Sequence, residues 1–245
     1  MQGILYRSLG VFMVFCSAAF ADAAPAKKVL FVVSGGYNSC SKSSQASRRA
    51  DAVPIVFSYK AMEKTIKTRG VEVMTLFSCL NDDAPPDGEA EYVLSENRGE
   101  HFGSTKDIRA DIEAILKKNP GTAVYLIGHS YGGYMAMYLA ETLAGTPNLQ
   151  GLFTLDPIGP DCGALGVVFG SDACHSAPTD RDNKAIARRT ATWHNFYQVE
   201  DSWLSSSEIP EAQNHHITFS WGPHGEMDTE KVVWDQIQKV VLKSL

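Results

Sequence analysis

The chain has 245 residues, of which 44% are hydrophobic, and its formal net charge at pH 7 is −6. This length fits one globular domain built around a single core. The acidic balance argues against a general nucleic-acid binder, although it does not restrict neutral substrates.

The first residues have the features of an export signal. Arg7 supplies a positive charge, and residues 9–20 form an apolar stretch too short for a stable membrane anchor. Ala19-Phe20-Ala21 fits a cleavage site, and Ala21-Asp22-Ala23 offers a second one. The alternative is an uncleaved N-terminal anchor. We expect a signal peptide over residues 1–23 and therefore an exported protein, periplasmic or secreted.

Four of the five cysteines follow this segment, namely Cys40, Cys79, Cys162 and Cys174. An even number of cysteines in an exported chain predicts two disulfides, for which three pairings are possible. Cys40 follows the first predicted strand and Cys79 ends the second, whereas the other two bracket one loop. We therefore favour the local pairing, Cys40 with Cys79 and Cys162 with Cys174. The spacing lacks the pattern of a zinc site, so we expect no structural metal.

Apolar runs alternate with segments of helical spacing along residues 24–245, which we expect to form a single domain without a membrane span. Strands are predicted at residues 28–34, 71–77, 123–127, 149–155 and 192–199, the last being the final full strand. Helices are predicted at 54–69, after a capping box at 104–107, after residue 130, and from Asp228 to the end. Alternation of this kind predicts a mainly parallel sheet with helices on both faces.

Three segments are expected to be less regular. Residues 81–103 contain Pro85-Pro86 and read as an exposed connection, and residues 157–191 as an irregular insertion. Residues 215–221 are expected to form a short strand or a turn.

The most informative pattern is Gly-His-Ser-Tyr-Gly at residues 128–132, between a predicted buried strand and a predicted helix. A serine at such a sharp bend presents its oxygen at the start of the helix, where the backbone N–H of Tyr131 is expected to receive an oxyanion. Larger side chains at Gly128 or Gly132 are expected to clash with the neighbouring strand or helix. Ser130 is therefore the candidate nucleophile; the alternative is a glycine-rich turn that contains a serine by chance.

This strand, the Gly-His-Ser-Tyr-Gly-Gly turn and the helix resemble the nucleophile elbow of the α/β-hydrolase superfamily. The resemblance implies a three-layer α/β sandwich and a serine hydrolase that needs no cofactor. It also implies that the loop after the first strand donates the second oxyanion N–H, through Gly36 or Tyr37. Ser34 stands where the family often has histidine, and a plain Gly-Gly turn is the alternative.

In this family the acid and then the histidine follow the serine along the chain. Among the seven histidines, His224 fits best because it lies in a Gly-Pro-His-Gly loop ahead of the last predicted helix. We expect His215 and His216 to have packing or solvated roles. His129 lies inside the elbow, from where its side chain is not expected to reach Ser130.

Two aspartates compete for the role of the acid. Asp156 ends a predicted strand in a Leu-Asp-Pro setting similar to that of pancreatic-lipase-like hydrolases, whereas Asp201 lies beyond the following strand, where most α/β-hydrolases place the acid. We favour Asp156. Asp201 would then be a loop charge.

The resemblance implies an exported enzyme that cleaves small-molecule carboxylic esters, lipid-like or with small acyl groups, through an acyl-enzyme intermediate. Thioesterases and amidases or peptidases share the same machinery, and a non-catalytic binding protein that retains the fold is a rival of a different class. Residues 157–191 lie where the family often inserts a lid, but they are too few for a full lid domain.

The export and disulfide hypotheses make one joint prediction. Thiol titration of the denatured mature protein is expected to find no free thiol before reduction and four after it, because Cys16 leaves with the signal peptide. A free thiol in the unreduced sample would contradict the two-disulfide hypothesis.

Overall fold

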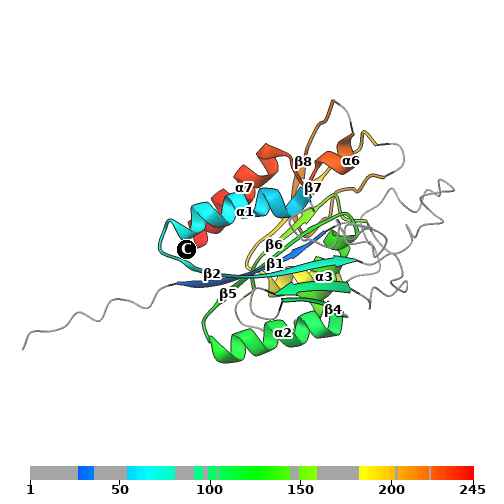
Figure 1. Cartoon of the computed structure of the whole chain (residues 1–245). Helices are drawn as coiled ribbons and strands as arrows, with labels where there is room; N and C mark the ends of the chain where they lie inside the picture. Colours follow the sequence, from blue (N-terminus) through cyan, green and yellow to red (C-terminus); the bar gives the residue numbers. More distant parts are fainter. Residues whose placement is uncertain are drawn as a thin grey trace, which may run out of the picture.

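The computed structural model describes residues 27–35, 54–80, 91–95, 99–103, 105–143, 149–158, 182–201, 204–220 and 222–245. Within these ranges, one eight-stranded sheet lies between two layers of helices (Figure 1). Several predictions fall outside the described residues: the signal peptide, the oxyanion donors Gly36 and Tyr37, and the disulfide cysteines Cys40, Cys162 and Cys174. The side chain of Cys79 is not described either.

Strands and helices alternate along most of the chain, except at β2-β3-β4, β7-β8 and α6-α7. They are β1 (Lys28–Ser34), α1 (Pro54–Lys67), β2 (Glu72–Leu80), β3 (Glu91–Ser95), β4 (Gly99–Gly103), α2 (Thr105–Lys118), β5 (Ala123–His129), α3 (Tyr131–Thr142), β6 (Leu149–Leu155), α5 (Asn183–Arg189), β7 (Trp193–Tyr197), β8 (Gln213–His216), α6 (Pro223–Glu226) and α7 (Lys231–Ser244). None of the helices in the described part of the chain combines the length and apolarity needed to span a bilayer.

The sheet has the strand order β4-β3-β2-β1-β5-β6-β7-β8, in which the six strands from β2 to β8 run parallel and β3 and β4 are antiparallel. The registers bring Ser34 opposite Gly128, and Gly128 opposite Thr154. The parallel strands therefore end together at one edge of the sheet, where the loops that follow them meet.

Continuous apolar runs form the central strands because both of their faces are covered. Along β1, Phe31 and Val33 belong to the core beneath α1 and α7, whereas Leu30 and Val32 belong to the core beneath α2 and α3. All four side chains are at most 1% exposed. The predicted three-layer α/β sandwich is confirmed.

The prediction for residues 81–103 is wrong at its end, where β3 and β4 extend the sheet as an antiparallel hairpin. β4 is an edge strand of the sheet and pairs only with β3. Its sequence, Gly-Glu-His-Phe-Gly, has the charged and glycine residues that an edge strand tolerates and lacks the apolar run of a central strand. β3 is only five residues long, too short for a clear periodic signal.

Two further predictions need correction. Within the segment expected to be irregular, α5 forms a short helix that Asp182 caps by accepting a hydrogen bond from the backbone N–H of Ala185, at 2.9 Å. The strand at 193–197 is not the last one, because β8 pairs alongside it. Both elements are short and carry few apolar residues, so periodicity gives only a weak signal.

The backbone around the elbow is too closely packed for any side chain at two glycines. A Cβ atom at Gly132 would lie 2.2 Å from the carbonyl oxygen of Gly35, and one at Gly128 would lie 2.1 Å from the carbonyl oxygen of Gly132. These contacts seat the start of α3 against the ends of β1 and β5. The predicted clash is confirmed.

Gly128→Ala and Gly132→Ala are each expected to lower the free energy of unfolding by about 3 kcal/mol, because the obstructing atoms belong to backbone that cannot rotate away. Gly225→Ala is the matched control, since a Cβ atom there meets nothing within 4 Å in the described part of the chain. Urea unfolding monitored by circular dichroism measures the difference. Equal midpoints for all three variants would contradict this view of the packing.

Candidate active site

Ser130 lies between the end of β5 and the start of α3 with φ 56° and ψ −130°. Its backbone N–H donates to the carbonyl oxygen of Leu155 at 2.9 Å, and its own carbonyl accepts from Gly133 and Ile158 at 2.9 and 3.1 Å. A positive φ at a non-glycine residue costs about 1–3 kcal/mol and persists only where surrounding contacts hold it. Here these contacts hold a strained bend that presents the serine side chain at the sheet edge.

The base predicted for the serine lies next to it. The Nε2 atom of His224, on α6, lies 2.9 Å from the Oγ atom of Ser130, and its Nδ1–H donates to Asp156 Oδ2 at 2.6 Å. His224 is 7% exposed and Asp156 is fully buried. With the Nδ1 proton directed at a carboxylate, the Nε2 lone pair of the neutral ring faces the serine hydroxyl, which is the tautomer a general base requires.

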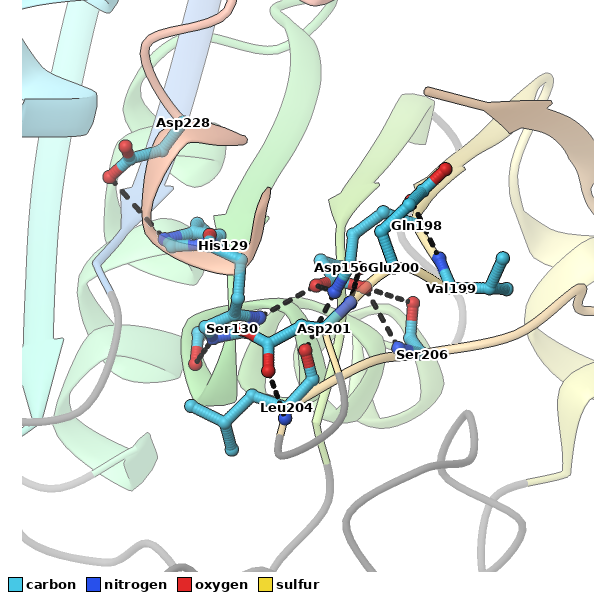
Figure 2. A network of polar contacts seen from close by, with 11 residues as sticks. His129, Ser130, Asp156, Gln198, Val199, Glu200, Asp201, Leu204, Ser206 and Asp228 are labelled. Carbon is cyan, nitrogen blue, oxygen red and sulfur yellow. Dashed lines mark hydrogen bonds and ion pairs between the residues drawn. The ribbon is translucent and has the colours of Figure 1, made fainter. Parts of the chain in front are cut away.

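Asp156 is held by more than the histidine, as Figure 2 shows. Its Oδ2 atom also accepts from the side-chain amide of Gln198 at 2.7 Å, and its Oδ1 atom accepts from the backbone N–H and the hydroxyl of Ser206 at 2.8 and 2.7 Å. Asp156 has φ 45°, and with Ser130 it is one of two non-glycine residues with positive φ in the described ranges.

These contacts decide the charge of Asp156. Burial alone would oppose ionisation, but the hydrogen bond and charge of His224, with the donors of Gln198 and Ser206, outweigh it and lower the pKa of Asp156 below its ordinary value. The carboxylate is therefore ionised at neutral pH and able to stabilise an imidazolium.

The carboxylate that reaches His224 is thus that of Asp156, whereas Asp201 serves the neighbouring turn. Asp201 donates its backbone N–H to Gln198 Oε1 at 2.9 Å and accepts from the backbone N–H of Leu204 at 3.2 Å. The same turn sets the orientation of the Gln198 amide that contacts Asp156. Gln198 and Ser206 are functional candidates absent from the sequence-based set. The structure shows both buried and bonded to the carboxylate, which no local sequence pattern indicates.

The elbow residue His129 turns away from Ser130, as expected, and enters a second buried pair. Its Nε2–H donates to the backbone carbonyl of His224 at 2.8 Å, and its Nδ1 lies 3.3 Å from Asp228 Oδ2. The last helix therefore does not begin at Asp228, as predicted, but at Lys231. Glu230 caps α7 by accepting from the backbone N–H of Val232, because the Asp228 carboxylate is directed at His129.

His215 and His216 lie on β8, away from the serine, and have packing roles as predicted. The Nε2 atom of His215 lies 2.9 Å from Nδ1 of His194, and its ring stacks on Phe196. Burial, and secondarily the charge of His215, lower the pKa of His194 to about 4. His216 stacks on Tyr197 and lies 3.3 Å from Glu200.

Of the predicted oxyanion donors, Tyr131 is the first residue of α3, so its N–H belongs to a helix N-terminus. Gly36 and Tyr37 lie outside the described residues. Among the residues that the structure describes, no group of three histidine, cysteine, aspartate or glutamate side chains is arranged to hold a metal ion.

Known proteins resemble this chain in sequence. The family model for the alpha/beta hydrolase fold matches residues 43–165, about half of the chain. A triacylglycerol lipase of Pseudarthrobacter phenanthrenivorans is 25% identical over 211 residues, which cover 73% of this chain and 61% of the lipase. A triacylglycerol lipase of Burkholderia plantarii is also 25% identical, over 73% of this chain and 55% of that lipase. The chain thus spans less than two thirds of the length of these curated relatives.

A solved structure supports the same fold. Est1E from Butyrivibrio proteoclasticus, with ferulic acid bound, is similar with a TM-score of 0.51 and 14% identity over 90% of each chain. The sheet order, the packed elbow and the sequence match agree with one another. The chain belongs to the α/β-hydrolase family.

Proposed function

We propose that the protein is an exported serine hydrolase that cleaves carboxylic esters with lipid-like or small acyl groups. The proposal rests on two buried hydrogen bonds of His224. Its Nε2 atom lies 2.9 Å from Ser130 Oγ, and its Nδ1 atom lies 2.6 Å from Asp156 Oδ2. A poor nucleophile, a base within reach and an ionised orienting carboxylate are the parts that acyl transfer requires.

In the first half of the reaction, Ser130 Oγ attacks the acyl carbon while His224 Nε2 takes the hydroxyl proton. The backbone N–H of Tyr131, with that of Gly36 or Tyr37, donates to the developing oxyanion. The carbon–oxygen bond to the alcohol then breaks, and His224 gives its proton to the leaving oxygen. An acyl-enzyme and a free alcohol result.

In the second half, water attacks the acyl-enzyme as His224 removes a proton from it. Collapse of this intermediate releases the carboxylic acid and returns the proton to Ser130 Oγ. Asp156 keeps its charge throughout and stabilises the imidazolium that forms in both halves, because Gln198 and Ser206 hold its carboxylate in place.

The choice of an ester substrate rests on the curated relatives, both triacylglycerol lipases. Thioesters and amides use the same chemistry, so a comparison of matched ester, thioester and amide substrates tests this part of the proposal. Export is supported by the N-terminal sequence and the four remaining cysteines.

The triad is tested by steady-state hydrolysis of a p-nitrophenyl ester. Ser130→Ala and His224→Ala are each expected to lower kcat by about 10³ or more, the size expected for a lost triad member. His216→Ala is the matched histidine control and is expected to stay near the native rate. A native protein that hydrolyses none of the ester, thioester and amide substrates would support a binding protein instead.

The same assay separates the two aspartates. Asp156→Asn keeps the shape of the side chain but removes the charge that stabilises the imidazolium, so kcat is expected to fall by roughly 10⁴ with the circular dichroism spectrum unchanged. Asp201→Asn is the matched control and is expected to remain within about tenfold of native. The reverse pattern would assign the acid to Asp201.

A further inference from the structure

Two buried pairs of imidazole and carboxylate lie side by side at the elbow. His224 with Asp156 forms the first, which the proposed reaction uses. His129 with Asp228 forms the second pair. The centroids of the His129 and His224 rings are 5.0 Å apart. The second pair is buried, with His129 6% exposed and Asp228 4% exposed, and the reaction as described does not use it.

The contacts of His129 fix where its protons lie. Its Nε2 atom is 2.8 Å from the backbone carbonyl oxygen of His224, and a carbonyl oxygen only accepts, so Nε2 carries a proton. Its Nδ1 atom is 3.3 Å from a carboxylate oxygen, and two lone pairs facing each other would repel. A second proton therefore lies between His129 and Asp228.

The surroundings favour this doubly protonated ring. Burial opposes its charge, but the hydrogen bond and charge of Asp228, the charge of Asp156 and the His224 carbonyl outweigh burial and raise the pKa of His129. Asp228 in turn relies on His129, because its other carboxylate oxygen is buried and has no hydrogen-bond partner among the described residues. The backbone carbonyl of Asp228 accepts from the indole N–H of buried Trp234 at 2.7 Å, which ties the pair to α7.

The turn that carries His224 is a short one. The base lies on α6, which has four residues and begins after Gly222 at φ 58°. His224 is followed by Gly225, where a Cβ atom would meet none of the described residues within 4 Å. A hydrogen bond to the carbonyl of His224 therefore fixes the peptide that carries the imidazole, at a site where a misplacement of 1 Å costs about 10² in rate.

We infer that His129 and Asp228 are positioning residues that hold the α6 turn, and with it His224, against the elbow. In Figure 2, Asp228 and His129 lie on the left above Ser130, whereas Gln198 and Ser206, which hold Asp156, lie on the right. The second pair thus holds His224, while Gln198 and Ser206 hold Asp156. The inference rests on the proposed role of His224 as the base.

Two double variants test it, and both remove the two charges of the second pair. His129→Gln with Asp228→Asn keeps an N–H donor near the position of Nε2, whereas His129→Met with Asp228→Asn has a side chain of similar length and no donor. The donor-keeping variant is expected to retain kcat within about tenfold of native, and the donor-lacking variant to lose about 10² in kcat with KM little changed. Circular dichroism checks that each variant folds. If the His129→Met variant fails to fold, His129→Leu with Asp228→Asn takes its place as the donor-lacking variant.

A second readout does not depend on catalysis. The Nδ1 proton of His224 in its short hydrogen bond to Asp156 is expected to give a downfield proton NMR signal, assigned by its loss in His224→Gln. The signal is expected to persist in the donor-keeping variant and to disappear in the donor-lacking one. Equal kcat values and equal signals in the two variants would overturn the inference. A native protein without hydrolytic activity would instead refute the proposed function, and the NMR comparison would still decide the positioning role.

Discussion

The close approach of backbone at Gly128 and Gly132 is the constraint on which the site depends. With no room for a Cβ atom at either position, the first turn of α3 lies directly against the ends of β1 and β5. That approach forces Ser130 into a positive φ, and the hydrogen bonds from Gly133 and Ile158 to its carbonyl hold it there. The packing of the surrounding backbone therefore holds the strained conformation of Ser130. This conformation directs the serine hydroxyl to the edge of the sheet where the parallel strands end.

Around this bend, buried charge is tolerated because each charged group has partners. Asp156 is fully buried, yet Gln198, Ser206 and His224 donate to its two oxygens. An isolated carboxylate there would pay a large desolvation cost, whereas a satisfied one is rigid and ready to stabilise a cation. The polar contacts therefore serve stability and the proposed chemistry together, and the loss of one partner would affect both.

The parts of this arrangement that sequence predicts are those with a local signal. Continuous apolar runs located β1 and β6, and the glycines on both sides of Ser130 located the elbow. Chain order within the family pointed to His224. No such signal marked Gln198, Ser206 or Asp228. Their roles come from contacts with residues that are distant in sequence: 42 positions for Gln198, 50 for Ser206 and 99 for Asp228. The hairpin of β3 and β4 was missed because β3 is only five residues long and β4, as an edge strand, needs no apolar run.

The proposed chemistry depends on Ser130 being a nucleophile that its buried partners activate. The most direct measurement is mass spectrometry of the protein after reaction with a fluorophosphonate, which phosphonylates an activated serine and releases fluoride. We expect one adduct per chain, on the tryptic peptide that contains Ser130, and none in Ser130→Ala. A native protein that remains unmodified, or an adduct that maps to a different serine, would contradict it.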